Sequence, residues 1–141
     1  MFAKILIALK FSPTGLYALK KGTALARIHG ANLHIFHALD YHFKDVAPTD
    51  SRLKSALDAV DQRFEKEIKP SIGDLTHVSF EYFPADPALE ACRIAKTIGA
   101  DLIVLGCHQS RHNIYMARID YVGMTILENS PCPVLLVPLA D

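Results

Sequence analysis

The sequence lacks the features that mark several large classes of protein. Its 141 residues carry 15 lysines and arginines against 15 aspartates and glutamates, so no excess of charge points to nucleic acid or an anionic membrane as a partner. The only cysteines are Cys92, Cys107 and Cys132, without CxxC spacing, which argues against a disulfide framework or a structural zinc site and fits a reducing cytoplasm. The apolar run Ile5 to Leu9 is too short for a signal-peptide core, and no run is long enough to span a bilayer.

Motifs that carry common enzyme chemistry are missing too. There is no P-loop, no GxSxG elbow and no Ser-His-Asp order. The histidines that follow predicted strands, His37, His42 and His108, form no HxH or HxxxH pair within one predicted helix, so we expect no metal site. We expect no catalysis, because no nucleophile and base stand together; a weak nucleotide hydrolase is the enzymatic alternative.

Apolar runs alternate with segments of helical periodicity along the whole chain. Predicted strands cover residues 5–9, 33–39, 77–83, 101–105 and 133–137. Predicted helices cover 12–29, 51–69, 87–98 and 118–127, with Pro70 ending the second and a polar loop over 40–49. Strict alternation predicts one α/β domain over residues 1–141: a five-stranded parallel sheet in strand order 3-2-1-4-5, with helices on both faces.

This strand order opens a crevice at the carboxyl ends of the first and fourth strands, where open α/β sheets bind ligands. We expect Lys10, Phe11 and Ser12 on one side of it. Gly106, predicted to form a turn, begins the other side, and the segment from Gly106 to Asp120 is where a phosphate-bearing ligand would lie. Cys107 falls in the predicted loop near a helix N-terminus that would lower its pKa; a redox role is possible, but an ordinary small turn residue is the preferred interpretation.

Five segments, taken in order, resemble the universal stress protein family: residues 4–9, 33–37, 85–88, 100–106 and 131–138. Together they span nearly the whole chain. The resemblance implies a Rossmann-like fold of the adenine nucleotide α-hydrolase-like type. It also implies a cytoplasmic protein of the stress response, usually a homodimer and often, but not always, ATP-binding.

The sequence departs from the pattern of the ATP-binding branch of the family that it resembles. That pattern has an aspartate after the first strand and, later in the chain, Gly-x-x-Gly-x9-Gly-Ser/Thr. Lys10 stands at the aspartate position and Gln109 at the second glycine, and the Gly-Ser position falls on Asp120 and Tyr121. The Gly-x-His-Gln form beginning at Gly106 looks more like the branch that does not bind ATP. The family-equivalent nucleotide positions are Lys10, Phe11, Ser12, Ala38, Gly106, Cys107, His108, Gln109, Asp120 and Tyr121.

Three of these substitutions suit ATP poorly. Gln109 replaces a glycine whose lack of a side chain lets backbone N–H groups reach phosphate oxygens. Lys10 offers donors but no acceptor, and leaving a ligand polar group unpaired costs about 1–3 kcal/mol. The charge of Asp120 would repel a phosphate, although the same carboxylate can cap a helix. A summed loss of about 4 kcal/mol turns a micromolar site into a millimolar one, so we expect no tight ATP binding and no cofactor. Two alternatives stay open: a different anion at Lys10, or weak binding of ATP or another adenine nucleotide that makes the protein nucleotide-responsive.

The last predicted strand is apolar and lies at one edge of the predicted sheet. An uncovered apolar edge is an aggregation hazard, and pairing with the same strand of a second subunit removes it. The resemblance implies the same mode, so we expect a homodimer, with unidentified protein partners possible. The strand positions concerned are Pro133, Val134, Leu135, Leu136 and Val137.

Overall fold

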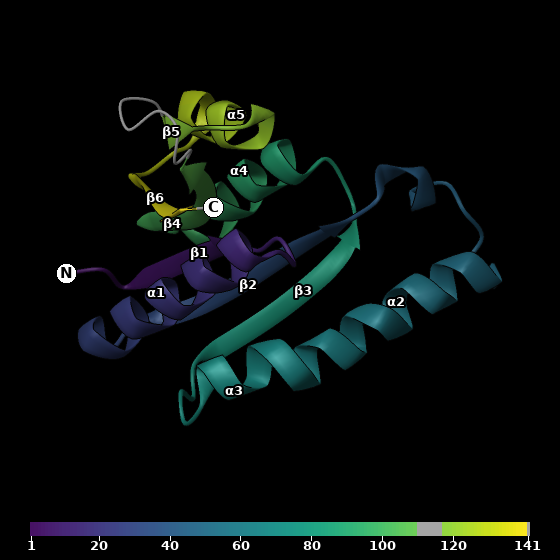
Figure 1. The fold of residues 1–141 in the computed structure, drawn as a ribbon, viewed down its shortest axis with the longest axis horizontal. Helices are drawn as coiled ribbons and strands as arrows, with labels where there is room; N and C mark the ends of the chain where they lie inside the picture. Colours follow the sequence, from purple (N-terminus) through teal and green to yellow (C-terminus); the bar gives the residue numbers. More distant parts are fainter. Residues whose placement is uncertain (110–116, 141) are drawn as a thin grey trace.

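A computed structural model describes residues 1–109 and 117–140 (Figure 1). Strands and helices alternate along it, as predicted. The strands are β1 (Lys4–Ala8), β2 (Asn32–Leu39), β3 (Val78–Pro84), β4 (Leu102–Gln109), β5 (Ala117–Arg118) and β6 (Val134–Ala140). The helices are α1 (Pro13–His29), α2 (Ser51–Arg63), α3 (Lys69–Ile72), α4 (Pro87–Ile98) and α5 (Tyr121–Asn129), with a 3-10 turn at Tyr41–Phe43.

The sheet has the predicted topology. Its parallel strands follow the order β3-β2-β1-β4-β6, which is the expected 3-2-1-4-5 arrangement. The short strand β5 was not expected: it pairs antiparallel with the end of β4, where the sequence predicts a helix from Arg118. That helix, α5, begins only at Tyr121, because Asp120 has extended backbone and caps it.

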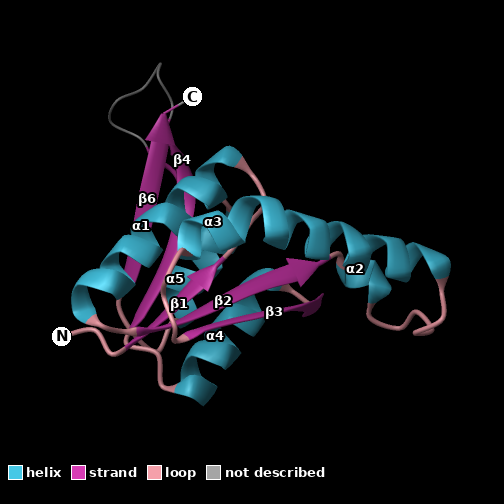
Figure 2. Cartoon of the chain, turned by 90° about the horizontal axis from the view of Figure 1, so that it is seen from below, coloured by secondary structure: helices cyan, strands magenta, loops and turns pink. Residues whose placement is uncertain are grey.

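Helices cover both faces of the sheet (Figures 1 and 2). On one face, Ile5 and Ile7 of β1 pack in a core with Leu19 of α1 and Ile72 of α3. On the other, Leu6 of β1 lies in a second core with residues of α4 and α5. The continuous apolar run in β1 therefore serves two cores at once, as expected of a central parallel strand.

The helix that Pro70 was predicted to end continues past it. A π-helical turn, Phe64–Ile68, joins α2 to α3, and within it the Lys69 N–H donates to the Phe64 carbonyl. This wider turn brings Pro70 into the first turn of α3, where its missing N–H costs little. The helix ends instead at Gly73, whose φ of 58° favours glycine.

Strand β4 is longer than predicted, so Gly106 lies inside a strand and not in a turn. A Cβ at Gly106 would overlap the backbone carbonyl of Thr14, in the first turn of α1. Glycine is therefore required by the close approach of β4 to α1. Cys107, predicted in a loop, is likewise a buried strand residue.

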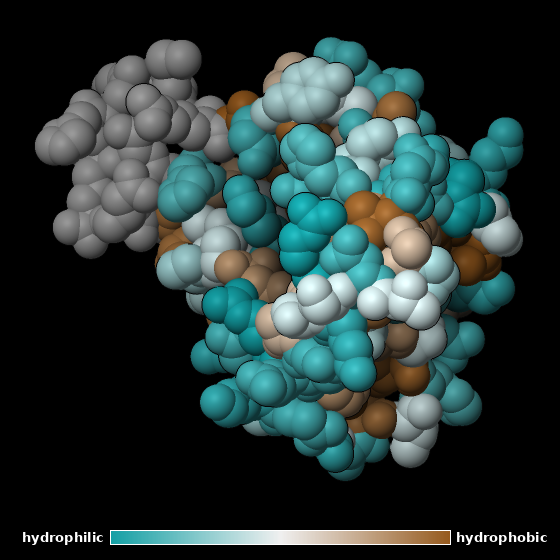
Figure 3. Space-filling view, turned by 90° about the vertical axis from the view of Figure 1, so that its right-hand side faces the viewer, coloured by the Kyte–Doolittle hydropathy of each residue, from teal (hydrophilic) through white to brown (hydrophobic). Residues whose placement is uncertain are grey.

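The surface is mixed in character. The side shown in Figure 3 is largely hydrophilic, with small hydrophobic patches between polar residues. In the parts of the chain that the structure describes, no helix is both long and apolar enough to cross a membrane.

Candidate functional site

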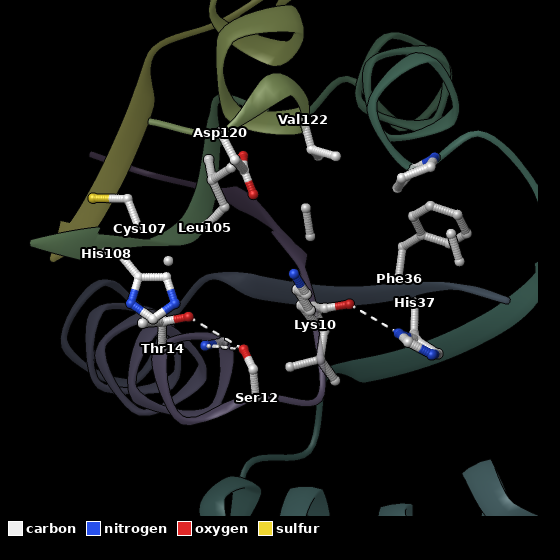
Figure 4. Close-up of a pocket in the computed structure, with 16 residues that line it drawn as sticks. Lys10, Ser12, Thr14, Phe36, His37, Leu105, Cys107, His108, Asp120 and Val122 are labelled. Atoms are coloured by element: carbon white, nitrogen blue, oxygen red, sulfur yellow. Dashed lines mark hydrogen bonds between the residues drawn. The ribbon is translucent and has the colours of Figure 1, made fainter. Parts of the chain in front are cut away.

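A cavity of about 640 Å³ opens at the carboxyl ends of β1, β2 and β4, where the strand order places the crevice (Figure 4). This volume falls in the range of small-molecule sites. Apolar residues of the strands and of α5 form much of its wall, and polar side chains from β2, β4 and two helix starts complete it. The lining residues are Ala8, Leu9, Lys10, Ser12, Thr14, Gly15, Phe36, His37, Ala38, Pro87, Leu105, Gly106, Cys107, His108, Asp120 and Val122.

The first turn of α1 lies beside the cavity and is capped by its own serine. The Ser12 hydroxyl oxygen accepts a hydrogen bond from the Gly15 N–H at 3.2 Å and lies 3.2 Å from the Thr14 hydroxyl. Gly15 has no room for a side chain, because a Cβ there would overlap the Lys10 carbonyl. The turn from β1 into α1 is thus tight, and one of the N–H groups that a ligand anion would need already has a partner.

The start of α5 is capped by a charged side chain. Asp120 Oδ1 accepts a hydrogen bond from the Gly123 N–H at 2.8 Å, which confirms the capping role expected for this residue. The same carboxylate lines the cavity (Figure 4). A negative charge therefore stands at the helix end whose dipole would otherwise favour an anionic ligand.

His37 contributes a neutral ring to the wall. Burial lowers its pKa, a hydrogen bond from Nδ1–H to the Leu9 carbonyl at 2.9 Å opposes this, and the charge of Arg63 adds to the lowering. Phe11 packs edge-on against that ring at 4.6 Å between centroids, and the Arg63 guanidinium lies over the Phe11 ring. At neutral pH the ring is thus a hydrogen-bonding group and not a cation.

Comparison with known proteins identifies the family. Residues 1–138 match the model of the Universal stress protein family. The chain belongs to this family. A search of curated proteins finds no match to the sequence.

Solved structures of similar shape cover nearly the whole of this universal stress protein. Hypothetical protein MJ0577, the subject of a structure-based assignment of biochemical function, is 26% identical, with 100% of this chain and 99% of that chain covered and a TM-score of 0.77. A universal stress protein in complex with cAMP is 18% identical, with 96% of each chain covered and a TM-score of 0.63. The universal stress protein from Archaeoglobus fulgidus in complex with dAMP is 14% identical, with 97% and 98% covered and a TM-score of 0.58. The last two likenesses show the fold alone.

Most of the predicted crevice residues of this universal stress protein line one cavity: Lys10, Ser12, Ala38, Gly106, Cys107, His108 and Asp120. Two do not line it. Phe11 packs edge-on against the His37 ring, and Tyr121 is 76% exposed at the start of α5. The side chain of Gln109 lies outside the described residues.

Sequence reasoning missed several lining residues, among them Thr14, Pro87 and Val122. Thr14 was recognisable only as part of a helix start, and Pro87 only as the first residue of a helix. Their approach to the crevice depends on how α1, α4 and α5 pack on the sheet. No local pattern reports that packing.

Of the three histidines considered for a metal, His37 and His108 line the cavity and His42 does not. His37 lies on β2 and His108 on β4, whereas His42 lies in the 3-10 turn and pairs with Asp40 at 2.6 Å. Among the residues that the structure describes, no group of three histidine, cysteine or acidic side chains could hold a metal ion.

The environment of Cys107 does not favour the redox alternative considered from the sequence. Burial, and next the charge of Asp120, raise the pKa of this thiol, whereas a helix N-terminus was expected to lower it. Burial also raises the pKa of Cys92 and Cys132. A thiol with a raised pKa holds little of the nucleophilic thiolate.

The native cysteines should therefore resist alkylation. In the folded protein at neutral pH, Cys107 should react with iodoacetamide at least about tenfold more slowly than in the urea-unfolded chain, because burial removes both access and thiolate. Peptide mass spectrometry over a time course measures each cysteine separately. Equal rates in the folded and unfolded protein would contradict this environment for Cys107.

Proposed function

We propose that this universal stress protein acts in the cytoplasmic stress response as a homodimer whose crevice neither binds ATP tightly nor turns over a ligand. The observation that carries the proposal is the Asp120 carboxylate, which caps α5 and lines the cavity. Unit charges 4 Å apart repel by about 4 kcal/mol near a protein surface, and we take about half of that because Asp120 is exposed. A phosphate at this helix start would meet that repulsion.

Lys10 adds to the same effect at the other side of the crevice. It lines the cavity two residues after the end of β1, at the position that resembles the aspartate position of the ATP-binding branch. An ammonium group cannot accept a hydrogen bond from a ribose hydroxyl or an adenine amine. The ligand would lose about 1–3 kcal/mol for each polar group left unpaired.

A second candidate function is a nucleotide-responsive stress protein. Universal stress proteins of the same fold are described in complex with cAMP and with dAMP, which carry one phosphate. The cavity volume of about 640 Å³ suits a ligand of that size. A monophosphate has less negative charge than ATP to place near Asp120, so this alternative concerns smaller nucleotides more than ATP.

Nucleotide carried through a gentle purification distinguishes the two candidates. Freshly purified protein is denatured and the supernatant is analysed by anion-exchange chromatography against ATP, AMP and cAMP standards. The proposal expects no stoichiometric adenine nucleotide. Release of about one equivalent of AMP or cAMP would favour the second candidate. Release of ATP would contradict the proposal that Lys10 and Asp120 disfavour ATP.

The homodimer is proposed on the last strand. Among the described strands β6 pairs only with β4, so its outer edge carries backbone groups without a strand partner. Leu135, in the middle of that edge strand, is 37% exposed. Pairing with β6 of a second copy would extend the sheet and cover this side chain.

A charge in the middle of β6 should break the dimer. Leu135→Glu should give a monomer or insoluble protein, because an apolar contact is replaced by a carboxylate that the interface would have to desolvate. The control is Leu89→Glu, since Leu89 is 58% exposed on α4. Light scattering after size exclusion measures the mass; a dimer unchanged by Leu135→Glu would rule out this strand as the interface.

A further inference from the structure

A second cavity, of about 530 Å³, opens at the amino ends of the strands, at the end of the sheet opposite the crevice. It lies between the starts of β1, β2 and β3 and the end of α4. Four of its lining residues matter here: Lys4, Asn32, His34 and Ser79. None of the four lines the crevice at the other end of the sheet.

A chain of two short hydrogen bonds runs through His34. Its Nδ1 lies 2.7 Å from the hydroxyl oxygen of Ser79, and its Nε2 lies 2.7 Å from Oε1 of Glu81. The His34 side chain is 18% exposed, whereas Ser79 is an exposed residue. A serine, a histidine and a carboxylate thus stand in the order that nucleophilic catalysis requires, with the serine accessible.

The register of two neighbouring strands produces this arrangement. His34 of β2 stands opposite Ser79 of β3, and Phe36 stands opposite Glu81 one side-chain repeat later. Ser79 and Glu81 share a face of β3 because side chains alternate along a strand. The His34 ring therefore contacts both Ser79 and Glu81, which lie two residues apart on the same face of β3.

The hydrogen bonds also fix the tautomer. A carboxylate only accepts, so Nε2 of His34 carries the proton that it donates to Glu81. In the neutral ring Nδ1 is then the acceptor, and it receives the Ser79 O–H. This is the protonation state that a general base needs before it removes the serine proton.

We propose that Ser79, His34 and Glu81 form a nucleophilic site for small activated esters. Ser79 Oγ attacks the ester carbonyl carbon while its proton passes to His34 Nδ1; the carbon–oxygen bond to the alcohol breaks and the alcohol leaves with that proton. Water, activated by His34, then attacks the acyl-serine and releases the carboxylic acid. Glu81 acts as a positioning residue that holds the ring and stabilises its charged form.

Two further polar side chains line the same cavity. Asn32 lies two residues before His34 on β2, about 6.6 Å along the strand, and Lys4 stands opposite Asn32 on β1. The Lys4 ammonium donates to the Ile98 carbonyl at 2.9 Å, which holds it at the cavity wall. An ammonium and an amide are groups of the kind that stabilise a developing oxyanion when they reach the reacting carbonyl.

No local pattern in the sequence indicates this cluster. The three residues follow the chain order His, Ser, Glu and not Ser-His-Asp, and their contacts depend on strand register. The expectation that no nucleophile and base stand together is therefore corrected for this end of the sheet. The inference is independent of the proposed function, since the two cavities share no lining residue that the structure describes.

A fluorophosphonate probe tests the site without knowledge of its substrate. Ser79 Oγ forms a bond to phosphorus, fluoride leaves, and His34 takes the proton. The expected result is time-dependent labelling of Ser79, located by peptide mass spectrometry, with Ser55 on α2 as an exposed serine in the same sample. His34→Ala should slow labelling by about 100-fold, the usual contribution of a general base.

Two further variants separate chemistry from structure. Imidazole added to His34→Ala should restore part of the labelling, and Glu81→Asp should retain more of it than Glu81→Gln; a merely structural role predicts neither. Circular dichroism confirms that each variant is folded. Labelling of wild-type Ser79 no faster than that of Ser55, or labelling unchanged by His34→Ala, would overturn the proposal.

Discussion

A chain carrying both Lys10→Asp and Asp120→Asn should bind ATP about 100-fold more tightly than the unaltered chain, a gain of about 3 kcal/mol. Asparagine caps a helix about as well as aspartate, so α5 should keep its start while the cavity loses a negative charge. Aspartate at position 10 supplies an acceptor where lysine has none. Calorimetric titration with ATP and magnesium measures the change.

The control has the same change in net charge away from the crevice. Lys20→Asp with Glu128→Gln alters two exposed residues of α1 and α5 that do not line the cavity. It should leave the ATP affinity unchanged. If the Lys10 and Asp120 exchange also has no effect, these two residues do not decide what the crevice binds.

Gly106→Ala should destabilise the protein by about 3 kcal/mol or more, because the new Cβ meets backbone and not a flexible side chain. The Thr14 carbonyl that it would overlap belongs to the first turn of α1, so β4 and α1 must move apart. This is also the contact that shapes one wall of the cavity. Urea unfolding followed by circular dichroism measures the loss.

Gly99→Ala is the matched control. Gly99 ends α4 with a φ of 70° and has no atom within 4 Å of a built Cβ, so alanine there is strained only by its backbone conformation. That strain costs about 1–2 kcal/mol. Equal losses for the two variants would show that β4 does not approach α1 as closely as the structure has it.

The sheet could be predicted because its signals are local. A continuous apolar run at 5–9, caps at Ser12 and Asp86, and glycines at 30 and 99 mark buried strands and helix ends without any tertiary information. Alternation of the elements then limits the topology to a few arrangements. Strand order in turn placed the crevice.

What could not be predicted depends on contacts between distant segments. Pro70 was expected to end a helix, and only the π-helical turn before it explains why the helix continues. Strand β5 exists because it pairs with the end of β4, and the contact of Ser79 with His34 follows from the register of β3 on β2. Cys107 was expected in a loop as an ordinary small turn residue, with a redox role through a lowered pKa as the alternative, whereas it lies in β4 and its burial there raises the pKa.

The measurement that tests the account most directly is calorimetric titration of the nucleotide-free protein with ATP and magnesium. The charge of Asp120 and the lack of an acceptor at Lys10 predict no saturable binding below millimolar ATP. A submicromolar dissociation constant would contradict the account, because it would mean that the crevice holds a triphosphate in spite of both residues.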